Sequence, residues 1–215
     1  MPRSGRPESR RVALLALVAL LAAGCGGDAA KDGASPNASD AAAARRALGF
    51  SGDSALGYIR TALAFGTRVP GSDGHRRTGD WLVAELRARG AEVVEQTWSH
   101  TTADGTTLPL RNILARFNPQ ATERVLYVTH WDTRPKAESD LDPTKKGLPI
   151  VGANDGTSGI GLFLALADGL RAKGPTVGVD LLFVDGEDYG EFSPSEVDVF
   201  LGSTYFAANP PTPGY

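Results

Sequence analysis

The sequence predicts an α/β fold: a mixed, mostly parallel central sheet flanked by helices. Short apolar segments that favour strands alternate along the chain with amphipathic segments at helical spacing. The last predicted strand, helix and strand have no hairpin signal between them, which indicates a parallel βαβ unit with a right-handed crossover. With 215 residues, 41% of them hydrophobic and 22% charged, the chain is long enough to bury the core of an ordinary domain.

The domain begins with two helices. Apolar residues at helical spacing predict a helix over residues 54–65, which a glycine ends. A loop rich in proline and glycine follows. A second amphipathic helix is expected over residues 75–89, with Ser72 or Asp73 as its N-cap and Gly90 at its end.

Three strands are expected next. Residues 91–100 alternate as a half-buried strand does, and Asp104-Gly105 predicts a hairpin turn into a strand at 110–117. Residues 125–129 predict a short buried strand.

The remaining elements form the crossover unit. A long loop that contains three prolines, residues 135–150, is either a lid or a surface excursion. An apolar helix is expected over residues 159–172 and a strand over residues 179–184. The predicted domain therefore covers residues 45–215.

Residues 1–25 predict a bacterial export signal. Four arginines precede an apolar run of about 12 residues, too short for a bilayer that needs about 20. "LAAGC" resembles the cleavage site of bacterial lipoproteins and predicts lipidation of Cys25, although Ala22 stands where leucine is commoner. Residues 26–44 are small and polar and predict a flexible linker. We expect a lipid anchor in a bacterial membrane, periplasmic or cell-surface, with free secretion or a structural N-terminal helix as alternatives.

Charge and cysteine content exclude several functions. Residues 1–24 carry four arginines and one glutamate, so their removal takes the formal charge from −3 to −6. No basic surface for nucleic acid is implied. Because Cys25 is the one cysteine, its lipidation leaves no disulfide, thiol nucleophile or thiolate metal site. A metal would take histidine and carboxylate ligands.

Three carboxylates end the last predicted strand. In "LLFVDGEDYG" a short apolar run stops at Asp185, Glu187 and Asp188. Like charges this close resist ionisation unless a cation or proton donor compensates them. The pattern therefore predicts a positive group nearby, although an ordinary polar turn would carry the same residues.

Further candidate ligands follow the other strand. His130 and Asp132 come directly after it, and Asp155 precedes the last predicted helix. Functional groups gather beyond the carboxyl ends of parallel strands, and this set suits zinc with nitrogen and oxygen ligands. Of the adjacent acids Glu187 and Asp188, one would bind the metal and the other act as general base. Taken singly, the histidine is equally a strand-end residue and Asp155 a helix N-cap.

These residues carry a resemblance to a known family. "LYVTHWDTRP", "VGANDGTSGIGLFLALADGL" and "LLFVDGEDYG" are similar, in this order, to the zinc-dependent aminopeptidases that include the glutaminyl-peptide cyclotransferases. "FGTRVPGSDGHRRTGDWLVAELRARGAEV" and "RNILARFNP" resemble the cyclotransferase branch in particular. The resemblance covers residues 65–208 and implies a three-layer zinc exopeptidase fold.

The resemblance implies roles for individual residues. Asp155 would be a zinc ligand, Asp188 another where many relatives have glutamate, and Glu187 the general acid and base. His130 would bind a second zinc in the aminopeptidases, whereas the equivalent histidine is no ligand in the single-zinc cyclotransferases. Asp132 would orient His130.

Three other residues near this site have less specific expectations. Asp185 is expected to support the ligands without touching the metal. Trp131 is either a site residue or part of the core. Arg134 either contacts substrate or pairs with a neighbouring acid, and we expect the pairing.

The implied function is a zinc enzyme, with one or two ions, that acts on peptide amino termini. We favour cyclisation of amino-terminal glutamine to pyroglutamate; the alternatives are an aminopeptidase and a non-catalytic, lipid-anchored binding protein. In the family, the last histidine ligand comes from a region beyond this chain, whose three histidines are His75, His100 and His130. We therefore expect the sequence to be a C-terminally truncated fragment, or else a degenerate member with an incomplete zinc shell.

Overall fold

The computed structural model describes residues 39, 43, 49–194 and 196–211. The chain divides into two compact units, residues 1–40 and 41–215, and all helices and strands given below belong to the second. The predicted export signal, Cys25 and nearly all of the predicted linker lie outside the described residues. Within the described part, no helix is long and apolar enough to cross a membrane.

Each predicted helix and strand is present, with ends that differ by a few residues, and a final helix is added that was not predicted. In chain order the elements are α3 (Gly52–Ala64), α4 (Asp73–Ala88), β1 (Glu92–Thr101), β2 (Thr107–Phe117), β3 (Arg124–His130), α5 (Thr157–Lys173), β4 (Gly178–Val184) and α6 (Leu201–Ala208). Of the two N-caps considered for α4, the structure selects Ser72, whose Oγ accepts a hydrogen bond from His75 N at 3.2 Å.

The sheet is mixed, with the strand order β1-β2-β4-β3. The Asp104-Gly105 hairpin makes β1 and β2 antiparallel, and β4 pairs antiparallel with the other edge of β2. β3 and β4 are parallel and joined through α5, as predicted. Among the described strands the parallel pairing is limited to this one pair, which corrects the expectation of a mostly parallel sheet.

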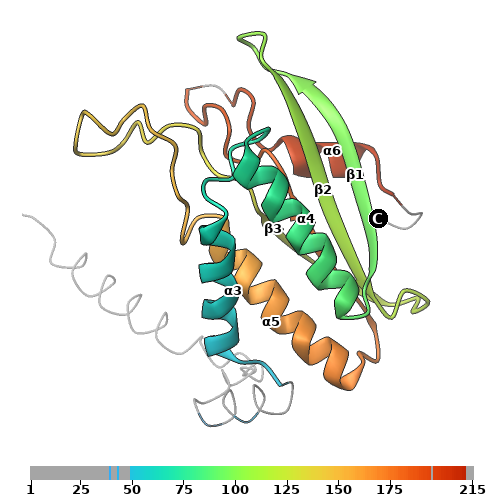
Figure 1. Cartoon of the computed structure of the whole chain (residues 1–215). Helices are drawn as coiled ribbons and strands as arrows, with labels where there is room; N and C mark the ends of the chain where they lie inside the picture. The colour runs from blue at the N-terminus through green and yellow to red at the C-terminus, as the bar shows by residue number, and fades with distance from the viewer. Residues whose placement is uncertain (1–38, 40–42, 44–48, 195, 212–215) are drawn as a thin grey trace, which may run out of the picture. The chain divides into compact units, whose positions relative to one another are not determined.

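Helices cover both faces of the sheet. α3, α4 and α5 lie on one side and α6 on the other (Figure 1). Successive side chains of β2 point to opposite faces of the sheet and join different cores. Ile113 belongs to the larger core under α4 and α5, and Leu114 belongs to a smaller core with Phe206 of α6. β4 is buried along its whole length because it lies between two strands and two helical layers.

β3 is the edge strand of the described sheet. Its four central residues, Val125 to Val128, are between 37% and 50% exposed. The prediction of a buried strand is therefore wrong for the described part of the protein, because no strand or helix there covers the outer edge of β3. Since β3 and β4 run in parallel, their carboxyl ends still meet at one edge of the sheet.

Candidate active site

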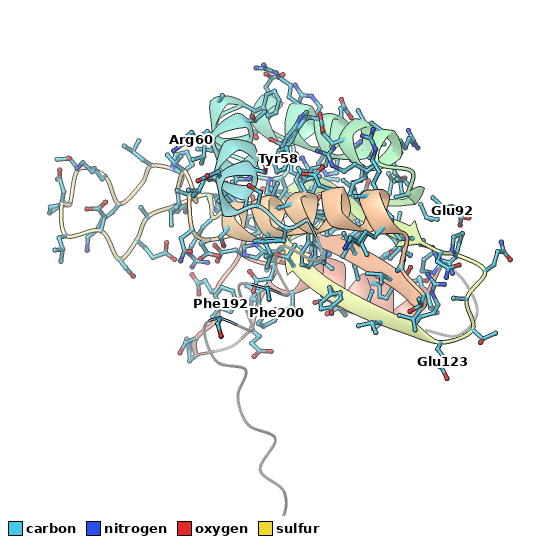
Figure 2. All side chains as sticks on the ribbon, turned by 90° about the horizontal axis from the view of Figure 1, so that it is seen from below. Tyr58, Arg60, Glu92, Glu123, Phe192 and Phe200 are labelled. Carbon is cyan, nitrogen blue, oxygen red and sulfur yellow. The ribbon has the colours of Figure 1, made fainter. Side chains whose placement is uncertain are left out.

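The predicted site residues come together where β3 and β4 end. His130 is the register partner of Val184, the last residue of β4, and Trp131 N continues the pairing with a 3.1 Å hydrogen bond to Val184 O. Glu123, which precedes β3, lies at the opposite end of the domain from Phe192 and Phe200 (Figure 2). The chain segments that follow both strands are thus side by side.

Each carboxylate of the Asp-Gly-Glu-Asp segment faces its own basic group. The pairs are Asp185 Oδ2 with His75 Nε2 at 2.9 Å, Glu187 Oε2 with His130 Nδ1 at 3.6 Å, and Asp188 Oδ1 with Arg134 Nη1 at 3.1 Å. A basic side chain therefore lies beside each of the three carboxylates. This arrangement allows three like charges to stand within four positions.

Asp132 joins the two segments of the site. Its carboxylate is fully buried and accepts hydrogen bonds from Glu187 N at 3.1 Å and Asp188 N at 3.2 Å. Oδ1 also lies 3.4 Å from His130 Nδ1, a buried atom that has no hydrogen-bond partner among the described residues. Asp132 therefore faces the imidazole, as expected, and in addition fixes the backbone of the two acids.

His130 also contacts the third predicted ligand. Its Nε2 lies 2.8 Å from Asp155 Oδ1. Burial opposes protonation of the imidazole, but the carboxylates of Asp132, Glu187 and Asp155 outweigh it and raise the His130 pKa to about 9. Asp155 is not the N-cap of α5, because that position is Gly156. The Asp155 carboxylate therefore does not cap α5, which was the alternative that the sequence allowed.

Glu187 has the protonation behaviour of a proton-transfer group. Burial raises the pKa of its half-buried carboxyl, and the nearby carboxylates, Asp132 first among them, raise it further against the opposing effect of His130. Burial likewise raises the pKa of Asp188, which Arg134 opposes. A raised pKa makes a glutamate better suited to accept a proton and return it in the same reaction.

Asp185 lies behind this cluster. It is fully buried and accepts hydrogen bonds from Arg111 N at 2.7 Å and Gly186 N at 2.9 Å besides facing His75. Burial raises its pKa and His75 opposes the shift. Trp131 is fully buried in the main core and stacks on His75 with ring centroids 4.3 Å apart, so it is a core residue.

Sequence reasoning missed two residues, one in the first turn of α4 and one in the loop before it. His75 lies in the first turn of α4, which we read only as an amphipathic helix, and the fully buried Arg68 lies in the Pro- and Gly-rich segment that we read only as a loop. The scarcity of histidine in the chain was a signal for the first, and nothing local marked the second. For Arg134 the expected acid pairing is confirmed, since it contacts both Glu138 and Asp188.

The donor types at this site fit zinc. His130 offers an imidazole nitrogen beside the carboxylate of Asp155. Asp188 adds another carboxylate, close enough to Asp155 for the two charges to interact. No group of three or more His, Cys, Asp or Glu side chains within the described residues is arranged to hold a metal ion. These residues thus supply a partial set of zinc donors.

The turn that presents Asp155 depends on Gly152. This residue has a φ of +66°, and a Cβ there would lie 2.4 Å from Thr133 Cγ2 and 2.5 Å from Asp155 O. We expect Gly152→Ala to lower the free energy of unfolding by about 2 kcal/mol or more, from backbone strain and the clash together. Urea denaturation measures the change.

Two control variants separate the causes. Gly105→Ala, at φ +86° with nothing within 4 Å, introduces strain alone, and Gly147→Ala in open space introduces neither effect. Gly147→Ala should stay within about 0.5 kcal/mol of the wild type. A Gly152→Ala protein no less stable than Gly105→Ala would show that the loop moves away from the added methyl group.

The chain is similar to several proteins of known family. Residues 112–214 match the family model described as peptidase family M28. The chain also matches solved structures over 77–78% of its length.

Three of these structures show the range of related proteins. They are a glutaminyl cyclase from Porphyromonas gingivalis (45% identity, TM-score 0.74), a Zn-dependent exopeptidase from Parabacteroides distasonis (42%, 0.73) and a leucine aminopeptidase precursor from Bacteroides thetaiotaomicron (39%, 0.73). The chain spans 58–59% of the length of these solved chains.

Proposed function

We propose that the protein is a zinc-dependent enzyme that acts on peptide amino termini and cyclises amino-terminal glutamine to pyroglutamate. The observation that carries the proposal is the placement of Glu187: half-buried, with a raised pKa, beside the His130–Asp155 pair at the end of the parallel strands. The similarity to a glutaminyl cyclase at 45% identity supports the cyclase reading.

The chain's own residues supply the proton transfers. The Glu187 carboxylate would take a proton from the substrate's α-amine as its nitrogen attacks the γ-amide carbon, and would return that proton to the departing ammonia. Asp155 and Asp188 would hold the zinc. When bound, zinc polarises the amide carbonyl as a Lewis acid. Asp132 keeps Glu187 in place through the Glu187 N–H.

An aminopeptidase is the second candidate. The direct contact between His130 and Asp155, with Asp132 on the other side of the imidazole, is the arrangement expected where the histidine joins Asp155 in a two-zinc site. Glu187 would then deprotonate the attacking water. The similarity to a Zn-dependent exopeptidase supports this reading equally. Export and lipidation at Cys25, predicted from the sequence, are part of both proposals.

Product analysis distinguishes the two activities. We expect the zinc-loaded protein to convert a peptide with amino-terminal glutamine into a product lighter by one ammonia, and to leave a matched peptide with amino-terminal leucine intact. Treatment with a chelator should abolish the reaction, and zinc should restore it where magnesium does not. Release of free leucine, with two zinc ions bound per chain, would replace the cyclase proposal by the aminopeptidase.

A further inference from the structure

Arg68 is a fully buried cation with no acidic partner within ion-pair distance among the described residues. It lies in the loop between α3 and α4, and no carboxylate within the described residues comes within ion-pair distance of its guanidinium. Its N–H groups instead donate to three backbone carbonyls: Nε to Trp131 O at 2.8 Å, Nη1 to Val151 O at 3.3 Å and Nη2 to Gly152 O at 3.1 Å. Buried charges are normally paired with an opposite charge, so we ask what the Arg68 guanidinium does in this position.

The three carbonyls belong to the two segments that form the site. Trp131 stands between His130 and Asp132, whereas Val151 and Gly152 lead into the turn that carries Asp155. The backbone of Arg68 adds contacts to the first segment, because Arg68 N donates to Thr133 Oγ1 at 2.8 Å and Thr133 N donates to Arg68 O at 3.2 Å. One side chain therefore connects the end of β3 to the Asp155 turn.

The position of the charge has a second effect. Burial lowers the pKa of Arg68 to about 10, while the Asp132 and Asp155 carboxylates act against this lowering. The guanidinium thus stays protonated at neutral pH. It therefore places a positive charge near the carboxylates of Asp132 and Asp155.

We propose that Arg68 is a positioning residue, which ties the His130–Asp132 segment to the Asp155 turn through three carbonyls and so sets the geometry of the metal-binding acids. The inference rests on the proposed function for the identity of the reacting groups. Lysine cannot replace arginine here, since its single ammonium lacks the planar fork that reaches two segments at once.

The test compares Arg68→Lys and Arg68→Met with Arg89→Met. Arg89 is also buried, but it contacts Glu85, Asp168 and Tyr58, none of which belongs to the site. All three variants should unfold at lower urea concentration than the wild type. Only the Arg68 variants should bind zinc more weakly, by about 10- to 100-fold in competition with a chelator. A folded Arg68→Lys protein that binds zinc within about twofold of the wild type would overturn the proposal.

Amide hydrogen exchange without metal tests the positioning directly. In Arg68→Lys we expect faster exchange at Thr133 N–H, and at Thr157 N–H, which donates to Gly152 O at 3.3 Å, with the core strands unchanged. In Arg89→Met both amides should exchange as in the wild type. Equal exchange of both amides in Arg68→Lys and the wild type would contradict the proposal. A wild-type protein that binds no zinc would instead refute the proposed function, and the exchange result would still decide the role of Arg68.

Discussion

Glu187→Gln is expected to lower kcat by about 10²- to 10⁴-fold and to leave zinc binding unchanged. Glutamine has nearly the same shape, but it cannot accept the proton of the α-amine or deliver it to ammonia. In the proposed site Glu187 is the proton carrier and not a metal ligand. Kinetics with a glutamine-terminated peptide and zinc titration of the same preparation measure both effects. Retained turnover would remove Glu187 from the mechanism.

The same variant should be more stable than the wild type when metal is removed. Burial raises the pKa of Glu187 in the folded state above its unfolded value, so the ionised carboxylate costs stability above that raised pKa. Glutamine avoids the cost. The stability gain is therefore present at neutral pH and is lost as pH falls through the folded pKa of Glu187, where the wild type is itself neutral.

Glu138→Gln is a control of opposite sign. The Arg134 guanidinium beside it holds the pKa of Glu138 below its usual value, so its ionised form stabilises the fold. Its replacement should lower stability slightly at neutral pH, with the difference disappearing in acid. Urea midpoints measured in chelator from about pH 4 to pH 8 compare the two variants. A Glu187→Gln protein that is less stable than the wild type at neutral pH would contradict the assignment of a buried, costly charge.

Asp132→Asn is expected to lower kcat/KM by about 10- to 100-fold and the free energy of unfolding by about 1–3 kcal/mol. Both carboxylate oxygens of Asp132 accept from buried backbone amides, those of Glu187 and Asp188, and Oδ1 also faces His130. Asparagine offers one acceptor oxygen, so its NH₂ group must face a donor. We expect Glu187, Asp188 and the His130 imidazole to be held less firmly, because Asp132 contacts all three.

Asp180→Asn is the matched control. Asp180 is equally buried and pairs with Arg124 and Arg116, near the start of β4 and so toward the other end of the strand from the site. Its replacement should lower stability but leave kcat/KM of the folded protein near the wild-type value. If Asp132→Asn behaves in the same way, with stability reduced and kcat/KM kept, Asp132 supports the fold and not the reacting groups.

The sequence by itself determined every described helix and strand of this protein except α6, and the position of its acids. Periodicity and turn residues are local properties, so the Asp104-Gly105 hairpin, the Ser72 cap and the β3–α5–β4 crossover were predicted and are present. The placement of His130 and Glu187 just beyond strand ends follows from the same local pattern. Their meeting required only that two strands be parallel.

Only the tertiary structure decided which groups neutralise and hold these acids. His75 meets Asp185 across 110 positions of sequence, and Arg68 meets Gly152 across 84, because the packing of α4 and of the loop before it brings them together. The exposed edge of β3 likewise depends on strand order, which an apolar run does not encode. Local patterns specify what a segment becomes, whereas the partner of a buried charge depends on where distant segments pack.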